Sequence, residues 1–217
     1  AWAHFLAAVM VASGTLLLSF WILSANSWMQ TPAGYELVDG LFYPKDWLAV
    51  IFNPSFPYRL AHTVVAFYIT TGFTVVAVWA WLLLRDPAAA EARTMISITL
   101  WLLSVLVPLQ MFIGDQHGLN TLEHQPAKLA AIEAHWETAS RFPLILFAIP
   151  DDETASNSYV VEVPLLGSLI LTHSVDGTVK GLTEWPEDQR PPVALPFFAF
   201  RIMVGVGLLM LLLVATS

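Results

Sequence analysis

Hydrophobic residues are concentrated in four long stretches, and more polar segments separate them. The stretches cover approximately residues 5–24, 60–84, 96–113 and 197–216. A helix needs roughly 20 mostly apolar residues to cross the hydrocarbon core of a bilayer. The pattern therefore predicts an all-α membrane protein with about four transmembrane helices.

The connecting segments differ in length and in charge. Residues 25–59 form a loop rich in aromatic residues and proline, and residues 85–95 form a tight turn that contains Arg85 and Arg93. Residues 114–196 form a long polar segment with twelve acidic and four basic residues. Because basic residues in short loops favour the cytoplasmic side, we expect the turn in the cytoplasm and both long loops outside.

A fifth apolar run, residues 160–172, is too short to span a membrane and contains Glu162 and Pro164. We expect an interfacial or hairpin segment there. The predicted organisation is three transmembrane helices in residues 1–113, an extracytoplasmic loop in residues 114–196 and the fourth helix in residues 197–217.

Composition supports the membrane prediction and excludes several other classes. The chain is 57% hydrophobic and 12% charged, with a mean hydropathy of +0.66, whereas an ordinary soluble domain is about 25% charged. It has no cysteine, which excludes disulfides, Fe–S clusters and covalent c-type heme. A net charge of -8 argues against a nucleic-acid partner. Both ends are apolar and the first residue is Ala1, so we expect a piece of a longer membrane subunit.

Two side chains in the predicted helices suggest a heme site. The second and fourth helices run in the same direction, and His62 and Met203 lie near the beginning of each. At 1.5 Å per residue, Met203 is about 9 Å into its helix. Imidazole and thioether are the axial pair of a six-coordinate, low-spin heme. Arg201 could pair with a heme propionate or extend to the membrane interface.

The same residues also have simpler interpretations. A methionine in a membrane helix most often serves only in packing. An ionisable side chain in a span, such as His62, is by contrast a functional hypothesis by default. His4 is the other membrane-embedded histidine, for which a structural or interfacial role is the better interpretation.

The long polar segment begins with a dense cluster of chemically active residues, GDQHGLNTLEHQPAKLAAIEAHWE at positions 114–137. Pro126 suits the first turn of a helix, and residues 127–137 are predicted to form a short amphipathic helix along the membrane surface. Its apolar face consists of Leu129, Ile132 and Trp136.

Lys128 and Glu133 flank this apolar face, because five residues correspond to about 140° around a helix. One interpretation is a solvated amphipathic helix; the other is a proton-handling site for an amphiphilic substrate, in which a carboxylate accepts a hydroxyl proton. The histidines of the cluster have spacings that match no compact metal-binding pattern. They are His117, His124 and His135.

The cluster resembles the quinol-binding loop of subunit I of cytochrome bd-type quinol oxidases, most closely the cyanide-insensitive branch with a short loop. Three other segments agree with that family in the same order. They are WILSANSWMQTP at 21–32, HTVVAFY at 62–68 and FAFRIMVG at 198–205.

The resemblance implies specific roles for five residues. His62 and Met203 would ligate the low-spin heme b (b558 type), with which Arg201 would be associated. Lys128 and Glu133 would take part in quinol oxidation, and protons would be released outside. The resemblance further implies a bacterial cytoplasmic membrane location, a partner subunit II, and a second heme b and heme d held by the remainder of subunit I. This chain would then hold the electron-input part of the enzyme only.

Two other functions remain open from the residues alone. A membrane carrier or channel could use His62 on a proton path, although polar residues are few along these spans. A non-catalytic membrane anchor would leave Lys128 and Glu133 without a chemical purpose, so their substitution would have no effect on activity.

Overall fold

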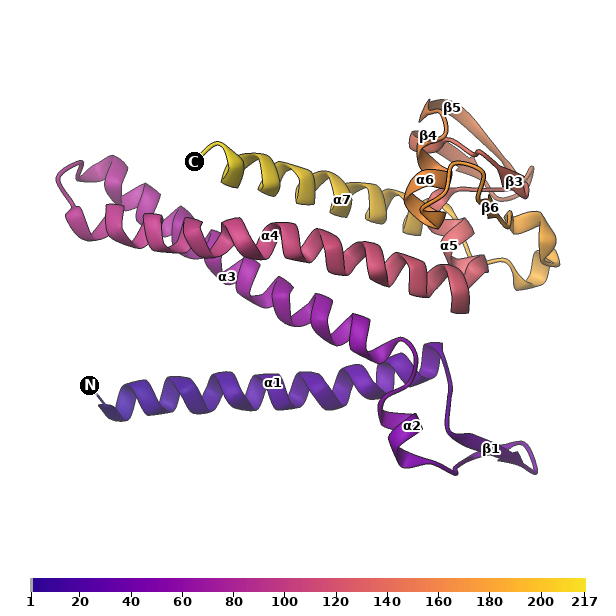
Figure 1. Ribbon diagram of the computed structural model, residues 1–217, viewed down its shortest axis with the longest axis horizontal. Helices are drawn as coiled ribbons and strands as arrows, with labels where there is room; N and C mark the ends of the chain where they lie inside the picture. Colours follow the sequence, from indigo (N-terminus) through magenta and orange to yellow (C-terminus); the bar gives the residue numbers. More distant parts are fainter. Residues whose placement is uncertain (1) are drawn as a thin grey trace. The chain divides into compact units, whose positions relative to one another are not determined.

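A computed structural model describes residues 2–217 (Figure 1). The elements, in chain order, are α1 (Trp2–Gln30), β1 (Tyr35–Val38), β2 (Leu41–Pro44), α2 (Trp47–Ile51), α3 (Phe56–Arg85), α4 (Ala90–His124), α5 (Pro126–Glu133), β3 (Ala139–Ser140), β4 (Leu144–Asp151), β5 (Ser156–Val163), α6 (Leu166–Thr172), β6 (Thr178–Val179), the 3-10 turns η1 (Leu182–Glu184) and η2 (Glu187–Gln189), and α7 (Ala194–Ala215).

The prediction of a mainly helical membrane protein with four long apolar helices is confirmed. Helices α1, α3, α4 and α7 are each long and apolar enough to cross a membrane. Helices α1, α3 and α4 extend beyond the apolar stretches, because neighbouring polar residues continue the helix. The connecting segments also contain three two-stranded antiparallel sheets, which the all-α prediction did not include.

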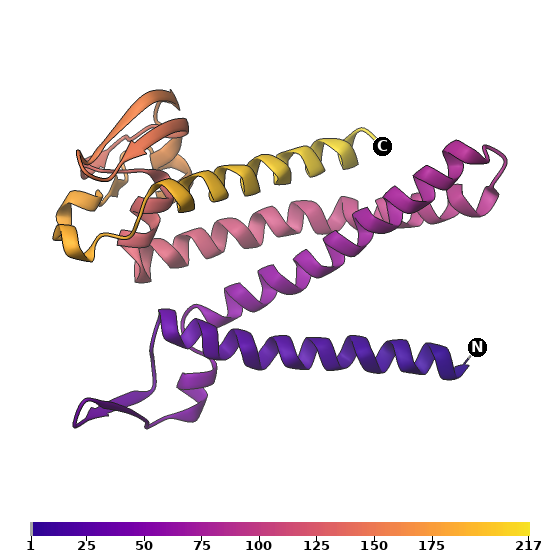
Figure 2. The same ribbon diagram turned by 180° about the vertical axis from the view of Figure 1, so that it is seen from behind.

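The chain divides into two compact units, the first ending at Ile96 and the second beginning at Ser97. In the first unit α1 packs against α3, and the segment between them forms the β1–β2 hairpin and α2 (Figure 2). The hairpin turns at Asp39 and Gly40, both with positive φ, which is the combination that a tight hairpin turn requires.

A network of neutral side chains joins the C-terminal end of α1 to the residues before α3. Thr31 Oγ1 lies 2.9 Å from Ser55 Oγ, and Asn53 Nδ2 donates to the Ser24 carbonyl at 3.2 Å. Ser24 Oγ in turn donates to the Ile51 carbonyl at 2.9 Å. All four polar side chains are buried, so the start of α3 is tied to α1 by hydrogen bonds without an ion pair.

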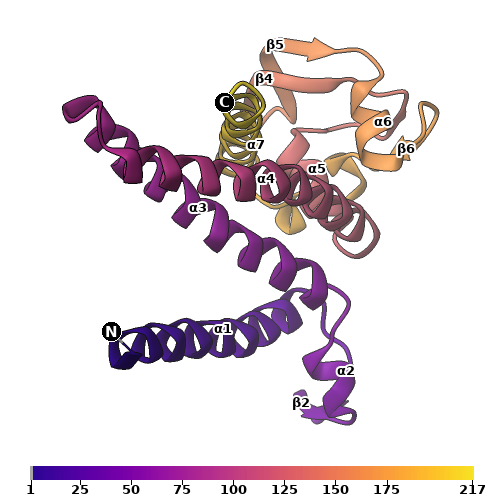
Figure 3. The same cartoon turned by 60° about the vertical axis from the view of Figure 1, so that its left-hand side comes forward.

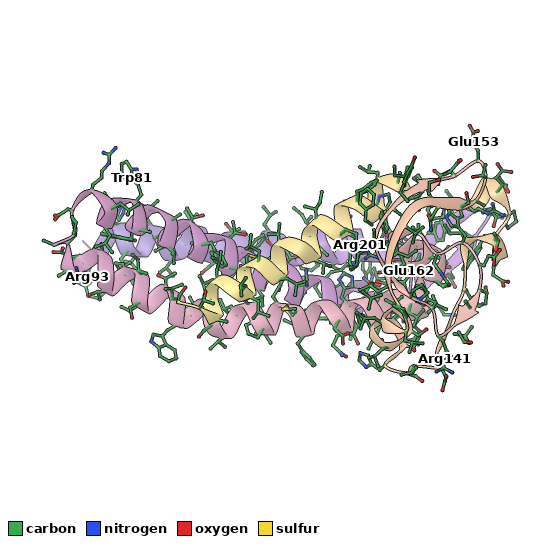
Figure 4. All side chains as sticks on the ribbon, turned by 90° about the horizontal axis from the view of Figure 1, so that it is seen from above. Trp81, Arg93, Arg141, Glu153, Glu162 and Arg201 are labelled. Atoms are coloured by element: carbon green, nitrogen blue, oxygen red, sulfur yellow. The ribbon has the colours of Figure 1, made fainter. Side chains whose placement is uncertain are left out.

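The turn between α3 and α4 is shorter than the segment 85–95 and consists of residues 86–89. The Arg85 guanidinium lies 3.9 Å from the centre of the Trp81 ring, and Arg93 Nη2 donates to the Pro87 carbonyl at 2.8 Å. Figure 4 shows Trp81 and Arg93 at this turn. The basic residues of the turn are therefore held by an aromatic ring and a backbone carbonyl.

The second unit consists of the remaining part of α4, the strand-bearing segment and α7. Figure 3 looks nearly along α7 and shows α5 and the β4–β5 hairpin beside it. Its buried core is formed by residues of α5, β4 and α7 together with the η1 segment. The core residues are Ala130, Ala131, Ala134, Trp136, Ile145, Ala148, Leu182, Val193 and Phe197.

The apolar run 160–172 divides between two elements. Its beginning lies in β5, which pairs with β4, so the hairpin prediction is correct there, and its end forms α6. Asp151 shapes the β4–β5 turn by accepting hydrogen bonds from the N–H groups of Glu153 at 3.0 Å and Thr154 at 3.3 Å. The Thr154 hydroxyl, together with these two backbone N–H groups, lowers the pKa of Asp151.

Candidate functional site

Helix α5 is shorter than predicted and ends at Glu133. It begins with Pro126 at its first position, and Ala134 adopts the left-handed conformation with φ 52° and ψ 41°. The N–H of His135 bonds to the Ala130 carbonyl at 2.8 Å, and the N–H of Ala134 to the Ala131 carbonyl at 3.2 Å. This is a Schellman-type ending with alanine where glycine is usual, which is why the sequence did not indicate it.

The Glu133 side chain points into the core of the second unit. Only 2% of Glu133 is exposed, and Ala130 and Ala131 of the same helix are also buried. The interpretation of this segment as a solvated amphipathic helix is therefore wrong. A buried carboxylate needs a charged or hydrogen-bonding partner, because burial removes its hydration.

Arg201 of α7 is that partner. Its Nη2 donates to Glu133 Oε2 at 2.6 Å, and its Nε donates to the Ile145 carbonyl of β4 at 2.6 Å. The guanidinium also lies 4.9 Å from the centre of the Phe197 ring. Figure 4 shows Arg201 at the end of α7 that adjoins the strands. The side chains of Arg201 and Glu133 are 14% and 2% exposed, so the pair is largely removed from solvent.

The ion pair fixes the geometry of the carboxylate. A charge-assisted hydrogen bond of this length is among the strong ones in proteins, and it uses Oε2 of Glu133. An ionised carboxylate can accept hydrogen bonds on both oxygens. The bond to Arg201 therefore does not use the acceptor capacity of Oε1. The pair also joins α5 directly to the helix that carries Met203.

The chain after α5 is held by the side chain of Asn157 on β5. Asn157 Nδ2 donates to the Ala134 carbonyl at 2.9 Å, and Asn157 Oδ1 accepts from Trp136 Nε1 at 2.9 Å. Thr183 contributes from the other side, because both its N–H and its hydroxyl bond to the Trp136 carbonyl. The β4–β5 hairpin and η1 thus fix the end of α5, and with it the backbone of Glu133.

Gly181 packs against the same segment. A Cβ at this position would lie 2.3 Å from the Trp136 carbonyl oxygen and from the Glu137 carbonyl carbon. These are backbone atoms that cannot move independently, so the close approach requires glycine.

Lys128 lies on the first turns of α5 and is half-buried. Its Nζ is 3.4 Å from Gln125 Oε1. Lys128 and Glu133 are five residues apart on the helix, and the ion-pair partner of Glu133 is Arg201. The structure therefore brings Glu133 and Arg201 together, and it places Lys128 Nζ beside Gln125, the residue before α5.

His62 and Met203 lie in different units, on α3 and α7. His62 is in the second turn of α3 and half-buried, and Met203 is 51% exposed. Met203 follows Arg201 by two residues, about 200° around the helix, so its thioether lies on the side of α7 away from the buried ion pair. An imidazole nitrogen and a thioether sulfur are donors of the kind that can ligate a heme iron.

The three histidines of the loop cluster have separate environments. His117 and His124 belong to α4, and His124 Nδ1 lies 3.1 Å from the Asn120 carbonyl. His135 is buried, and its ring centre is 4.2 Å from that of Phe142. Burial lowers the pKa of His135, more than the Val179 carbonyl and the charge of Glu137 raise it. Within residues 2–217 no three His, Cys, Asp or Glu side chains are grouped to hold a metal ion.

Sequence reasoning identified Glu133 and Arg201 separately but missed that they form a pair. It also missed Asn157 and the Ile145 carbonyl. No local pattern could have shown these contacts, because the ion pair joins residues 68 positions apart.

Comparison with known proteins gives consistent matches along the whole chain. The family model for cytochrome bd terminal oxidase subunit I matches residues 1–217. Subunit 1 of the cytochrome bd-II ubiquinol oxidase of Escherichia coli (strain K12) is 31% identical, over 94% of this chain and 40% of the relative. Subunit 1 of the cytochrome bd ubiquinol oxidase of Bacillus subtilis (strain 168) is 30% identical, over 96% of this chain and 47% of the relative.

A solved structure is similar as well. The bd oxidase from Geobacillus thermodenitrificans matches with a TM-score of 0.87 and 31% sequence identity, over 98% of this chain and 49% of that chain. The chain therefore spans less than half the length of these relatives.

Proposed function

Because the chain belongs to the cytochrome bd terminal oxidase subunit I family, we propose that it carries the quinol-oxidising, electron-input part of a bd-type quinol oxidase. The family and the four apolar helices indicate a bacterial membrane protein. The observation that carries the proposal is the buried ion pair between Glu133 and Arg201. It joins the short helix of the proposed quinol site to the helix that bears a proposed heme ligand.

Glu133 acts in this proposal as the acceptor of a proton from a quinol hydroxyl. Arg201 holds one carboxylate oxygen at 2.6 Å, which leaves the other oxygen for the substrate. A carboxylate within hydrogen-bond reach of a quinol hydroxyl can take up its proton as a general base. Lys128 has an ammonium group that can donate to the second quinol oxygen and stabilise negative charge as it develops there.

His62 and Met203 are the residues that would hold a low-spin heme b. When bound, this heme would accept the electrons of the quinol one at a time. Arg201 remains a candidate for a contact with it, in addition to its bond with Glu133. Release of the quinol protons on the outer side would conserve energy as a membrane potential.

The remaining parts of the enzyme are proposed to lie outside this chain. They are the rest of subunit I, which would hold the second heme b and heme d, and subunit II. In the complete assembly the electrons would pass to the oxygen-reducing site and convert O2 to water.

The proposal is tested by Glu133→Gln in the complete, heme-loaded oxidase in membranes. We expect quinol oxidation to fall by about 10²-fold, the lower range for loss of a general base, while electron input from artificial donors and the low-spin heme spectrum are retained. Glu153→Gln is the matched control, because Glu153 is exposed at the tip of the β4–β5 hairpin (Figure 4).

Unchanged quinol oxidation in Glu133→Gln would refute the proposed role and favour a non-catalytic anchor. Equal loss of activity with quinol and with artificial donors would show that Glu133 serves folding only. A carrier or channel would give no quinol-dependent electron transfer in the parent protein.

A further inference from the structure

Arg59, like Arg201, lies near the N-terminal end of a long helix, and only part of its guanidinium group is hydrogen-bonded. It lies in the first turn of α3, where its Nη1 donates to Asn26 Oδ1 of α1 at 3.1 Å. Its Nε is buried and has no hydrogen-bond partner. A buried guanidinium N–H that lacks an acceptor is costly, so this atom indicates that a further acceptor belongs there.

Arg59 is not part of an ion pair in the described part of the chain. Among residues 2–217, no carboxylate lies within ion-pair distance of Arg59. The nearby side chains that tie α1 to α3 are neutral, namely Ser24, Thr31, Asn53 and Ser55. The cation therefore lacks a counter-charge from the part of the chain that the structure describes.

Arg59 and His62 are close neighbours on α3. They are three residues apart, which corresponds to about 60° around the helix and about one turn along it. Residues at this spacing are neighbours on the helix surface. A ligand held by the imidazole of His62 is thus within reach of the Arg59 side chain.

We propose that Arg59 binds a propionate group of the heme that His62 ligates, an inference that rests on the proposed function. A b-type heme carries two carboxylates on one edge, and a guanidinium recognises a carboxylate with good geometry. The ligand would supply both the acceptor for Nε and the missing negative charge. Because the cation stabilises the extra electron of the reduced heme, Arg59 raises the midpoint potential.

The test is a redox titration of the low-spin heme in the complete oxidase. Arg59→Gln removes the charge and is expected to shift the heme equilibrium about tenfold toward the oxidised form, a fall of about 59 mV for one electron. Arg59→Lys keeps the charge and should restore most of the potential. Arg59→Leu repeats the test if the Gln variant does not assemble.

Asn26→Ala is the matched control, because it removes the protein partner of Arg59 without changing any charge. Its potential should equal that of the parent. A parent-like potential in Arg59→Gln or Arg59→Leu, in a protein whose low-spin signal is lost in His62→Ala, would overturn this inference and leave the proposed function standing. An equal fall in Asn26→Ala would show that Arg59 acts through helix packing, and would overturn it as well.

Discussion

The two units position their candidate site residues by different interactions. In the first unit, the start of α3 is tied to α1 by neutral hydrogen bonds among Ser24, Thr31, Asn53 and Ser55. In the second unit, the end of α5 is tied to α7 by the ion pair of Glu133 and Arg201. Each neutral bond contributes about 0.5–1.5 kcal/mol, whereas removing one partner of a buried ion pair costs about 3–5 kcal/mol.

This difference has a consequence for function. A network of neutral bonds can lose one member and still hold two helices together. A buried carboxylate with one cationic partner cannot lose that partner without a large loss of stability. The second unit therefore uses its proposed proton acceptor as one half of a buried ion pair between two helices, whereas the first unit links α1 to α3 through several neutral side chains and the bond from Arg59 to Asn26.

The largest expected effect is that of Arg201→Leu. It leaves the Glu133 carboxylate buried without a cation, so the free energy of unfolding should fall by about 3–5 kcal/mol.

Thermal unfolding in detergent, followed by circular dichroism, would measure the loss. Adding Glu133→Leu should recover most of it, since a well-packed apolar pair can replace a buried ion pair. If the double variant is no more stable than the single one, the ion pair is not the source of the effect.

Asn157→Ala should have a smaller effect on the same unit. It removes the acceptor for the Trp136 indole N–H and the donor to the Ala134 carbonyl, and an unsatisfied buried group costs about 1–3 kcal/mol. The same unfolding measurement applies, with Ser158→Ala as the control on an exposed position of the same strand. Equal stability of the two variants would mean that Asn157 does not hold the end of α5.

The sequence predicted the long helices well, but it did not predict the contacts between distant residues such as Glu133 and Arg201. Hydropathy predicted the four long helices, because a long apolar stretch has few alternatives to a transmembrane helix. The motifs identified Glu133 and Arg201 one at a time. Their pairing depends on how the strand-bearing segment folds back onto α7, which no local pattern encodes.

The end of α5 shows the same limit on a smaller scale. Leu129, Ile132 and Trp136 have the spacing of one helical face, which predicted a helix as far as residue 137. The backbone instead reverses at Ala134, and Trp136 lies beyond the helix, bonded to Asn157. Tertiary hydrogen bonds determine this ending, since alanine has no preference of its own for the left-handed conformation.

Thr31→Val tests the first unit and should have a modest effect. It removes the hydroxyl that lies 2.9 Å from Ser55 Oγ and keeps the shape of the side chain, so we expect a loss of about 0.5–1.5 kcal/mol. Thr71→Val is the control, because the Thr71 hydroxyl is exposed and bonds only within its own helix. A loss as large as that of Arg201→Leu would contradict the comparison between the units.

The smallest expected effect is a pH dependence due to His135. Burial lowers its pKa below the ordinary value of about 6.5, so the unfolded chain takes up a proton at a higher pH than the folded one. The contribution of His135 to stability is therefore fully present above pH 6.5 and is lost as the pH falls through the folded pKa. Unfolding measured between pH 7 and pH 5 should show a shallower decline in His135→Phe, and identical slopes would be inconsistent with this.

The most direct test of the central claim is a reduced-minus-oxidised spectrum of the complete oxidase with Met203→Leu, compared with Met210→Leu on the same helix. If this chain carries the electron-input heme, the low-spin b-type signal is lost in Met203→Leu and retained in Met210→Leu. A low-spin signal that survives Met203→Leu unchanged would contradict the assignment of the His62–Met203 site.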